Sequence, residues 1–317
     1  MRLLGLLGIA TTGAMAFLSL ASGCGARTEL VAPPLEDATP EIIAADHHDA
    51  TSEDSAEEDV IPHIDQFVDS PIPTDCPDAG STFVYVITAE NKLYSFYPPS
   101  LGFTSIGTIA CPNAKSTPYS MAVDRKGTAF SVFADGTLWQ ISTANAACKP
   151  TSYVPSPQGT PFFNFGMGFV GTQTTDTLYV CDANFNSVNS KGLATIDTTS
   201  FKRNFVANFQ PELPRCELTG TGDGRLFAFC LVNSGGSEIA EIDPATAKVI
   251  AVNQLKVGNV NDAFAYAFWG GYFWIFHGPG GSTTVVQYDP VTFSETDVKT
   301  LQGETIVGAG VSTCAPQ

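Results

Sequence analysis

The sequence predicts an all-β fold, a five-bladed β-propeller, from three observations. A short phrase recurs five times, its copies lie 45 to 55 residues apart, and an additional strand pattern follows the last copy. The copies are KLYSFYPPS (92–100), TLWQISTAN (137–145), GLATIDTTS (192–200), EIAEIDPAT (238–246) and TVVQYDPVT (284–292). Their aligned apolar positions lie 45, 55, 46 and 46 residues apart. This spacing is typical of four-stranded propeller blades.

The recurring phrase reads as a β-strand. Side chains two apart on a strand share a face, and each copy places two apolar residues two apart with a polar residue between them, as in Trp139, Gln140 and Ile141. Asp-Pro pairs end the last two copies at 243–244 and 289–290, because proline lacks the N–H that a strand ladder needs. We expect the phrase to form the third strand of each blade.

The residues around the phrase supply the other strands. In the second copy we expect strands at 119–123 and 128–133 before the phrase and a fourth strand near 151–154. In the fourth copy we expect strands at 216–220, 226–232 and 249–255, and the first strands of the third and fifth copies at 166–170 and 263–268. Glycine and aspartate turns separate these runs, as in β-hairpins.

The two ends of the repeat region complement each other. No first strand precedes Phe83 in the first copy, whereas an extra strand pattern occupies 306–311 after the last copy. We expect this C-terminal strand to complete the first blade, because a ring closed in this way leaves no exposed strand edge. The propeller then spans residues 79–317.

Residues 1–23 read as an export signal. An apolar stretch follows Arg2 and ends in Leu20-Ala21-Ser22-Gly23-Cys24, which resembles the signal of bacterial lipoproteins, although Ala21 holds the place where the family prefers leucine. The resemblance implies cleavage before Cys24, a lipid on its sulfur and a membrane anchor. Gly25 in place of aspartate favours the outer membrane, facing the periplasm or the cell surface. The alternative is an ordinary cleaved signal peptide with a chance cysteine.

Residues 24–78 read as a disordered, acidic, proline-rich linker. Positions 25–80 carry fifteen Asp or Glu residues and only Arg27 as a basic residue, so they hold most of the net charge of −17. Such a segment is too polar to bury a core. The propeller itself is only mildly acidic and lacks a basic stripe, so the sequence predicts no nucleic-acid partner. We expect a monomer.

The cysteines fit an oxidising compartment. Of eight cysteines, seven remain once Cys24 is set aside, so at least one has no partner within the chain. Cys216 and Cys230 lie at equal distances from the centre of a predicted hairpin, so we expect a disulfide between them. Cys76 and Cys314 would meet where the ring closes, and a second disulfide there would lock it. The sequence assigns no pairing to Cys111, Cys148 and Cys181.

One insertion carries a candidate metal site. The third copy is lengthened by the loop 182–189, in which Asp182, Asn184 and Asn186 alternate as at the start of a calcium loop. The resemblance to an EF-hand loop is partial, because Ser187 stands in place of its glycine and Leu193 in place of its glutamate. Calcium is therefore the one cofactor considered, and a hairpin loop rich in Asn and Ser is the alternative.

Three acids lie near the starts of first strands in consecutive blades: Glu217, Asp262 and Glu304. The architecture resembles that of five-bladed glycosidases, which implies paired carboxylates around a central funnel. The alternative is solvated loop residues. His277 precedes a glycine-rich segment and is interpreted as a loop residue rather than a base. The nearby aromatic residues Phe162, Phe163, Phe165, Phe264, Tyr266 and Trp269 are expected to fill the core between blades rather than to form a stacking surface for a ligand.

The chain as a whole resembles bacterial propeller-repeat lipoproteins. The resemblance rests on the segment ending at Cys24 and on all five repeats, and repeats of this kind specify a fold better than a ligand. We therefore expect a membrane-tethered binding or interaction module for a protein or glycan, without catalysis. The alternative is a hydrolase of glycans or lactones that uses the funnel carboxylates, with or without calcium.

Overall fold

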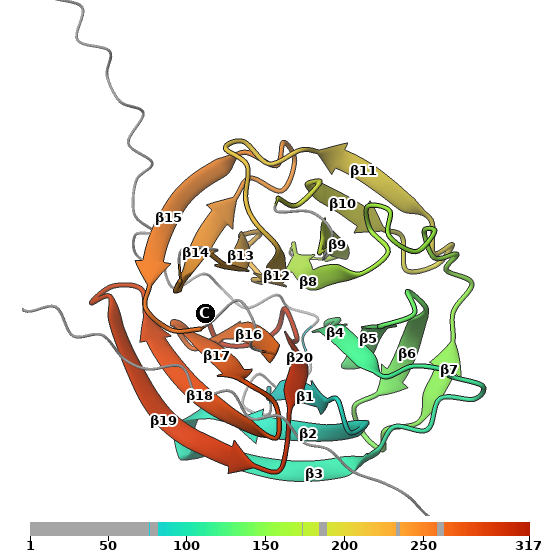
Figure 1. Cartoon of the computed structure of the whole chain (residues 1–317), viewed down its shortest axis with the longest axis horizontal. Helices are drawn as coiled ribbons and strands as arrows, with labels where there is room; N and C mark the ends of the chain where they lie inside the picture. Colours follow the sequence, from blue (N-terminus) through green and yellow to red (C-terminus); the bar gives the residue numbers. More distant parts are fainter. Residues whose placement is uncertain (1–75, 77–81, 173, 184–188, 233–234, 259–262) are drawn as a thin grey trace, which may run out of the picture. The chain divides into compact units, whose positions relative to one another are not determined.

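The computed structural model describes residues 76, 82–172, 174–183, 189–232, 235–258 and 263–317. Within these residues, five antiparallel four-stranded sheets stand in a ring around a central axis (Figure 1). The chain is therefore a five-bladed β-propeller, as the sequence predicts. The predicted export signal and the acidic linker lie outside the described residues, apart from Cys76, and stay predictions.

Each blade has its own four strands, which follow one another from the axis outwards. Blade 1 contains β20 (Ile306–Val311), β1 (Val84–Thr88), β2 (Lys92–Tyr97) and β3 (Gly102–Thr108). Blade 2 contains β4 (Pro118–Val123), β5 (Thr128–Phe133), β6 (Leu138–Ser142) and β7 (Cys148–Pro150). Blade 3 contains β8 (Phe165–Gly171), β9 (Asp176–Asp182), β10 (Leu193–Ile196) and β11 (Arg203–Ala207).

The remaining strands form two further blades. Blade 4 contains β12 (Cys216–Gly220), β13 (Leu226–Leu231), β14 (Ser237–Ile242) and β15 (Val249–Leu255). Blade 5 contains β16 (Ala263–Trp269), β17 (Tyr272–Gly278), β18 (Ser282–Asp289) and β19 (Ser294–Gln302). The recurring phrase forms the third strand of every blade, which confirms how the repeat was interpreted.

The C-terminal strand closes the ring. β20 pairs antiparallel with β1, with Val311 opposite Val84 and Ala309 opposite Val86, and it is the innermost strand of blade 1. This closure was predicted from the spare strand pattern at 306–311. The first blade is thus assembled from residues at both ends of the propeller.

One strand was misplaced by the sequence argument. The outer strand of blade 2 was expected near 151–154, but it occupies Cys148–Pro150. The turn before it is short, because the N–H of Ala146 donates to the carbonyl of Ser142. Pairing with β6 then begins at Cys148. Pro150 ends the strand, since it has no N–H with which to continue the ladder.

Aromatic side chains fill the spaces between blades. Phe227 and Phe229 of blade 4 pack against Tyr266, Phe268 and Phe273 of blade 5, with ring centroids 5.1 Å apart for the pair Phe227 and Phe273. Of the aromatic residues expected in the core, Phe162, Phe165 and Tyr266 are buried, whereas Phe163, Phe264 and Trp269 are partly exposed.

Glycines let the innermost strands approach one another closely. A Cβ atom on Gly166 of β8 would lie 2.4 Å from the carbonyl oxygen of Cys216 on β12, and one on Gly220 would lie 2.3 Å from that of Phe169. Real Cβ atoms do not come this close to backbone atoms. Glycine is therefore required at these positions, and the axis is narrow here.

Three disulfides tie the propeller together. Cys76 is bonded to Cys314 and Cys216 to Cys230, as predicted, and Cys111 is bonded to Cys148. Cys181 is a buried free thiol. Among the described residues, no helix has the length and apolar character needed to cross a membrane.

Candidate functional site

A small cavity lies where the innermost strands begin. It has a volume of about 190 Å³ and is lined by Pro118 and Tyr119 of β4, Glu217 of β12, Ala263 and Phe264 of β16, Val307 of β20, and Arg215. Four blades contribute to it, so it lies at one end of the central axis. We call it the axial pocket.

Glu217 is the one carboxylate among the described residues that line the axial pocket. Its side chain is almost fully buried. The hydroxyl of Ser120 donates to its Oε2 at 2.7 Å. Burial raises the pKa of Glu217 well above its usual value, while the hydrogen bond from Ser120 and the charge of Arg215 act in the opposite direction.

We expect Glu217 to make folding stability fall as the pH rises. Its folded-state pKa is raised, so above about pH 4.5 the unfolded chain loses this proton while the folded chain keeps it. Stability then falls until the pH passes the folded-state pKa. Glu217→Gln should remove this fall, as measured by urea unfolding between about pH 4.5 and about pH 8. The exposed Asp297→Asn is the control, and parallel curves for Glu217→Gln and wild type would refute the prediction.

Two neutral groups lie near Glu217. The thiol of Cys181 donates to the carbonyl of Cys216 at 2.9 Å, and the hydroxyl of Tyr119 donates to that of Ala183 at 3.4 Å. Burial raises the pKa of both. Both groups therefore keep their protons at neutral pH.

The carboxylate of Asp182 accepts hydrogen bonds from backbone N–H groups. Asp182 ends β9 and is buried, its Oδ1 accepts the N–H of Phe162 at 2.7 Å, and its Oδ2 accepts the N–H of Lys191 at 3.0 Å. Asn184 and Asn186, its predicted companions, lie outside the described residues. The described residues contain no group of three or more His, Cys, Asp or Glu side chains arranged to hold a metal ion. Calcium at this loop stays a prediction.

Two of the three predicted funnel acids, Glu217 and Glu304, have different surroundings in the structure. Glu304 does not line the axial pocket; its Oε1 accepts hydrogen bonds from the ammonium of Lys92 and, at 2.9 Å, from the hydroxyl of Tyr94, both on β2. Asp262 lies outside the described residues. Of the three acids, the structure places Glu217 in the axial pocket and Glu304 beside the third strand of blade 1.

His277 is a strand residue, not the loop residue that was expected. It lies in β17, opposite Phe264 of β16 and Thr284 of β18. The strand runs on because backbone pairing with β18 continues to this residue, and the turn begins only after Gly278.

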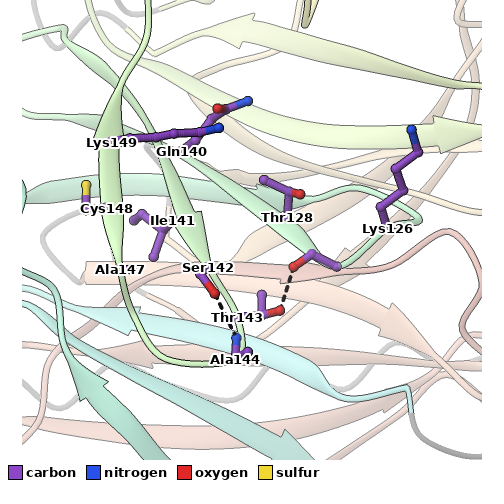
Figure 2. A pocket seen from close by; sticks show the side chains of 11 residues that line it. Lys126, Thr128, Gln140, Ile141, Ser142, Thr143, Ala144, Ala147, Cys148 and Lys149 are labelled. Atoms are coloured by element: carbon purple, nitrogen blue, oxygen red, sulfur yellow. Dashed lines mark hydrogen bonds between the residues drawn. The ribbon is translucent and has the colours of Figure 1, made fainter.

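A second cavity lies on blade 2 and was not anticipated from the sequence. Its volume is about 430 Å³, and its lining includes Lys126, Thr128, Gln140, Ser142 and Lys149 (Figure 2). Lys126 follows the end of β4, whereas the axial pocket lies where β4 begins, so the two cavities are at opposite ends of this strand. We call it the blade 2 crevice. Comparing the five repeats column by column would have revealed its lysines.

No protein-family model matches the chain, and no curated protein matches its sequence. Among solved structures, a chain of a nidogen/laminin complex is 18% identical over 76% of this chain and 83% of its own length, with a TM-score of 0.42. TolB from Acinetobacter baumannii is 10% identical over 75% and 68%, with a TM-score of 0.42. Regucalcin from Agrobacterium tumefaciens, a calcium-binding protein, is 12% identical over 74% and 76%, with a TM-score of 0.40. This level of likeness assigns no ligand.

Proposed function

We propose that the protein is an exported, lipid-anchored propeller that binds a protein or glycan ligand at its axial pocket and does not transform it. The observation that carries the proposal is the convergence of four blades on one cavity that combines an arginine and a carboxylic acid with an apolar wall. Sites for small ligands typically join a mostly apolar lining to a few polar groups of this kind.

The size of the axial pocket limits what enters it. About 190 Å³ is smaller than the roughly 300 to 1,000 Å³ of sites that enclose a whole drug-sized ligand. The ligand therefore inserts one group, such as a side chain or the edge of a sugar. Pro118, Phe264 and Val307 offer apolar contact, and the guanidinium of Arg215 lies 5.6 Å from the centre of the Phe264 ring.

The lipid anchor places this module at a membrane. The segment ending at Cys24 supports lipid attachment, and the acidic linker 24–78 would hold the propeller away from the bilayer, with the outer membrane as the proposed location. Cys24→Ala should move the full chain from the membrane fraction to the soluble fraction. Unchanged membrane association of this variant would refute the anchor.

Hydrolysis is the less favoured function. Glycoside hydrolysis requires two carboxyl groups that flank the scissile bond. Glu217 lines the axial pocket, but Glu304 is not in its lining and pairs with Lys92 of β2. The described residues thus bring one carboxyl group to the pocket.

We expect glycans or peptidoglycan fragments that bind the mature chain to bind Arg215→Gln about tenfold or more weakly, because the variant loses a charge-assisted contact. The measurement is a binding screen by calorimetry, with the exposed Lys202→Gln as the matched control. Equal affinity for Arg215→Gln and wild type would show that the axial pocket is not the binding site. Release of new reducing ends from a bound glycan would support the hydrolase instead.

A further inference from the structure

The blade 2 crevice is formed by two turns and the strand face between them. Lys126 lies in the turn between β4 and β5, and Lys149 lies on β7 opposite Gln140 of β6. Figure 2 shows Lys126 on one side of the crevice and Lys149 beside Gln140 on the other, with Thr128 between them. Its volume of about 430 Å³ falls within the range of small-molecule sites.

The charge in the crevice is opposite to that of the whole chain. Both charged side chains in its lining are lysines, although the chain carries a net charge of −17. Within the described residues, neither lysine forms an ion pair. The nearest acid in sequence, Asp124, turns its Oδ1 towards the backbone N–H groups of Lys126 and Thr128, at 2.9 and 2.8 Å. Two lysines without an ion-pair partner among the described residues therefore line the cavity.

The crevice is held in shape before any ligand arrives. The hydroxyl of Thr143 donates to the carbonyl of Gly127 at 2.5 Å, which ties the two turns together. The disulfide between Cys111 and Cys148 fixes β7 one residue before Lys149. A site whose walls are already fixed loses less freedom when it binds.

The repeat supplies an internal comparison. In every blade, the central polar residue of the recurring phrase pairs with a residue of the outer strand: Thr104 in blade 1, Lys149 in blade 2, Asn204 in blade 3, Ala251 in blade 4 and Thr296 in blade 5. Lysine occurs at this position in blade 2 alone. In blade 4 the residues equivalent to Lys126 and Gln140 are both acidic, Asp223 and Glu241. Lysine at this position of the outer strand is thus particular to blade 2 and is not a property of the repeat.

We propose that the blade 2 crevice binds the phosphate or sulfate group of a phosphorylated or sulfated sugar. Lysine ammonium groups bind such oxyanions as point charges with several hydrogen-bond donors. The hydroxyls of Thr128 and Ser142 and the amide of Gln140 suit the hydroxyl groups of the same sugar. This site is separate from the axial pocket and does not depend on the function proposed for it.

The test uses glucose 6-phosphate as the probe and glucose as its uncharged match, with the full mature chain in calorimetry or NMR titrations at low salt. Glucose 6-phosphate should bind, glucose should not, and added salt should weaken the binding. Lys126→Gln combined with Lys149→Gln should lower the affinity about tenfold or more. Lys248→Gln, in the turn between β14 and β15 of blade 4, should leave the affinity unchanged. Arg215→Gln in the axial pocket should also leave it unchanged.

Three outcomes would overturn the proposal: no binding of glucose 6-phosphate at low salt, equal binding of glucose, or an unchanged affinity in the double lysine variant. Binding to vesicles that contain phosphatidylglycerol distinguishes a lipid headgroup from a sugar phosphate as the ligand. Lysine-dependent binding to these vesicles, without binding to the sugar phosphate, would assign the crevice to a membrane surface and refute the sugar. Because both lysines are exposed, their replacement should leave the thermal unfolding of the variant unchanged.

Discussion

Removing the disulfide between Cys76 and Cys314 should destabilise the propeller more than removing either of the other two. The bonded cysteines are 238 residues apart, compared with 37 for Cys111–Cys148 and 14 for Cys216–Cys230. A disulfide lowers the entropy of the unfolded chain, and its effect grows with the length of the loop that it closes. We expect Cys76→Ala with Cys314→Ala to lower the free energy of unfolding by about 3 to 5 kcal/mol.

Urea unfolding of three double-alanine variants, one for each disulfide, measures this ranking. The two shorter loops are the matched controls, because each variant loses the same covalent bond and two sulfur atoms. The expected order follows loop length, with about 1 to 2 kcal/mol between the longest loop and the intermediate one. If the variant without the Cys216–Cys230 disulfide loses the most unfolding free energy, local packing around a disulfide determines its contribution to stability, and ring closure does not.

Breaking the buried ion pair between Arg125 and Asp176 should have an effect of similar size. The guanidinium Nε donates to the Asp176 Oδ1 at 2.8 Å, and both side chains are only 7% exposed. Asp176 also accepts the hydroxyl of Thr313 at 2.9 Å, so this cluster joins blades 2 and 3 to the segment after β20. Asp176→Ala would leave the Arg125 charge buried without its partner, which typically costs about 3 to 5 kcal/mol.

A double-mutant cycle measures the coupling between these two residues. We expect Arg125→Leu with Asp176→Leu to destabilise the fold by less than the sum of the two single changes, because no buried charge then lacks a partner. The more exposed pair of Arg225 and Glu241 is the control, and Glu241→Ala should cost less. Equal losses of unfolding free energy for Asp176→Ala and Glu241→Ala would contradict this expectation.

The sequence predicted the features of the fold that repetition specifies. Five copies of one phrase located the third strand of each blade, and the spare pattern at 306–311 located the closing strand. The outer strand of blade 2 was predicted a few residues too late in the chain, because Tyr153 and Val154 look like strand residues. A short turn and Pro150 instead place the strand earlier, at Cys148–Pro150, where it pairs with β6 and Cys148 is bonded to Cys111.

The candidate sites were harder to predict, because they depend on contacts between distant residues. Acids at the starts of strands look alike in the sequence, yet Glu217 turns towards Ser120 near the axis while Glu304 turns towards Lys92. Asp182 was chosen as a metal ligand from its neighbours in sequence, but its partners are backbone N–H groups from residues 20 and 9 positions away. Sequence spacing does not contain this information.

The pairing of β20 with β1 also sets the timing of folding. These strands are separated by almost the whole propeller in sequence, so the first blade cannot be completed until the last strand is available. Blades 2 to 5 consist of consecutive strands, and each can form as its residues emerge. We therefore expect blades 2 to 5 to form first and the pairing of β20 with β1, which completes blade 1, to be a late and slow step. Contacts between residues far apart in the sequence form slowly. During that interval β1 is an unpaired edge, which makes it the segment most exposed to aggregation.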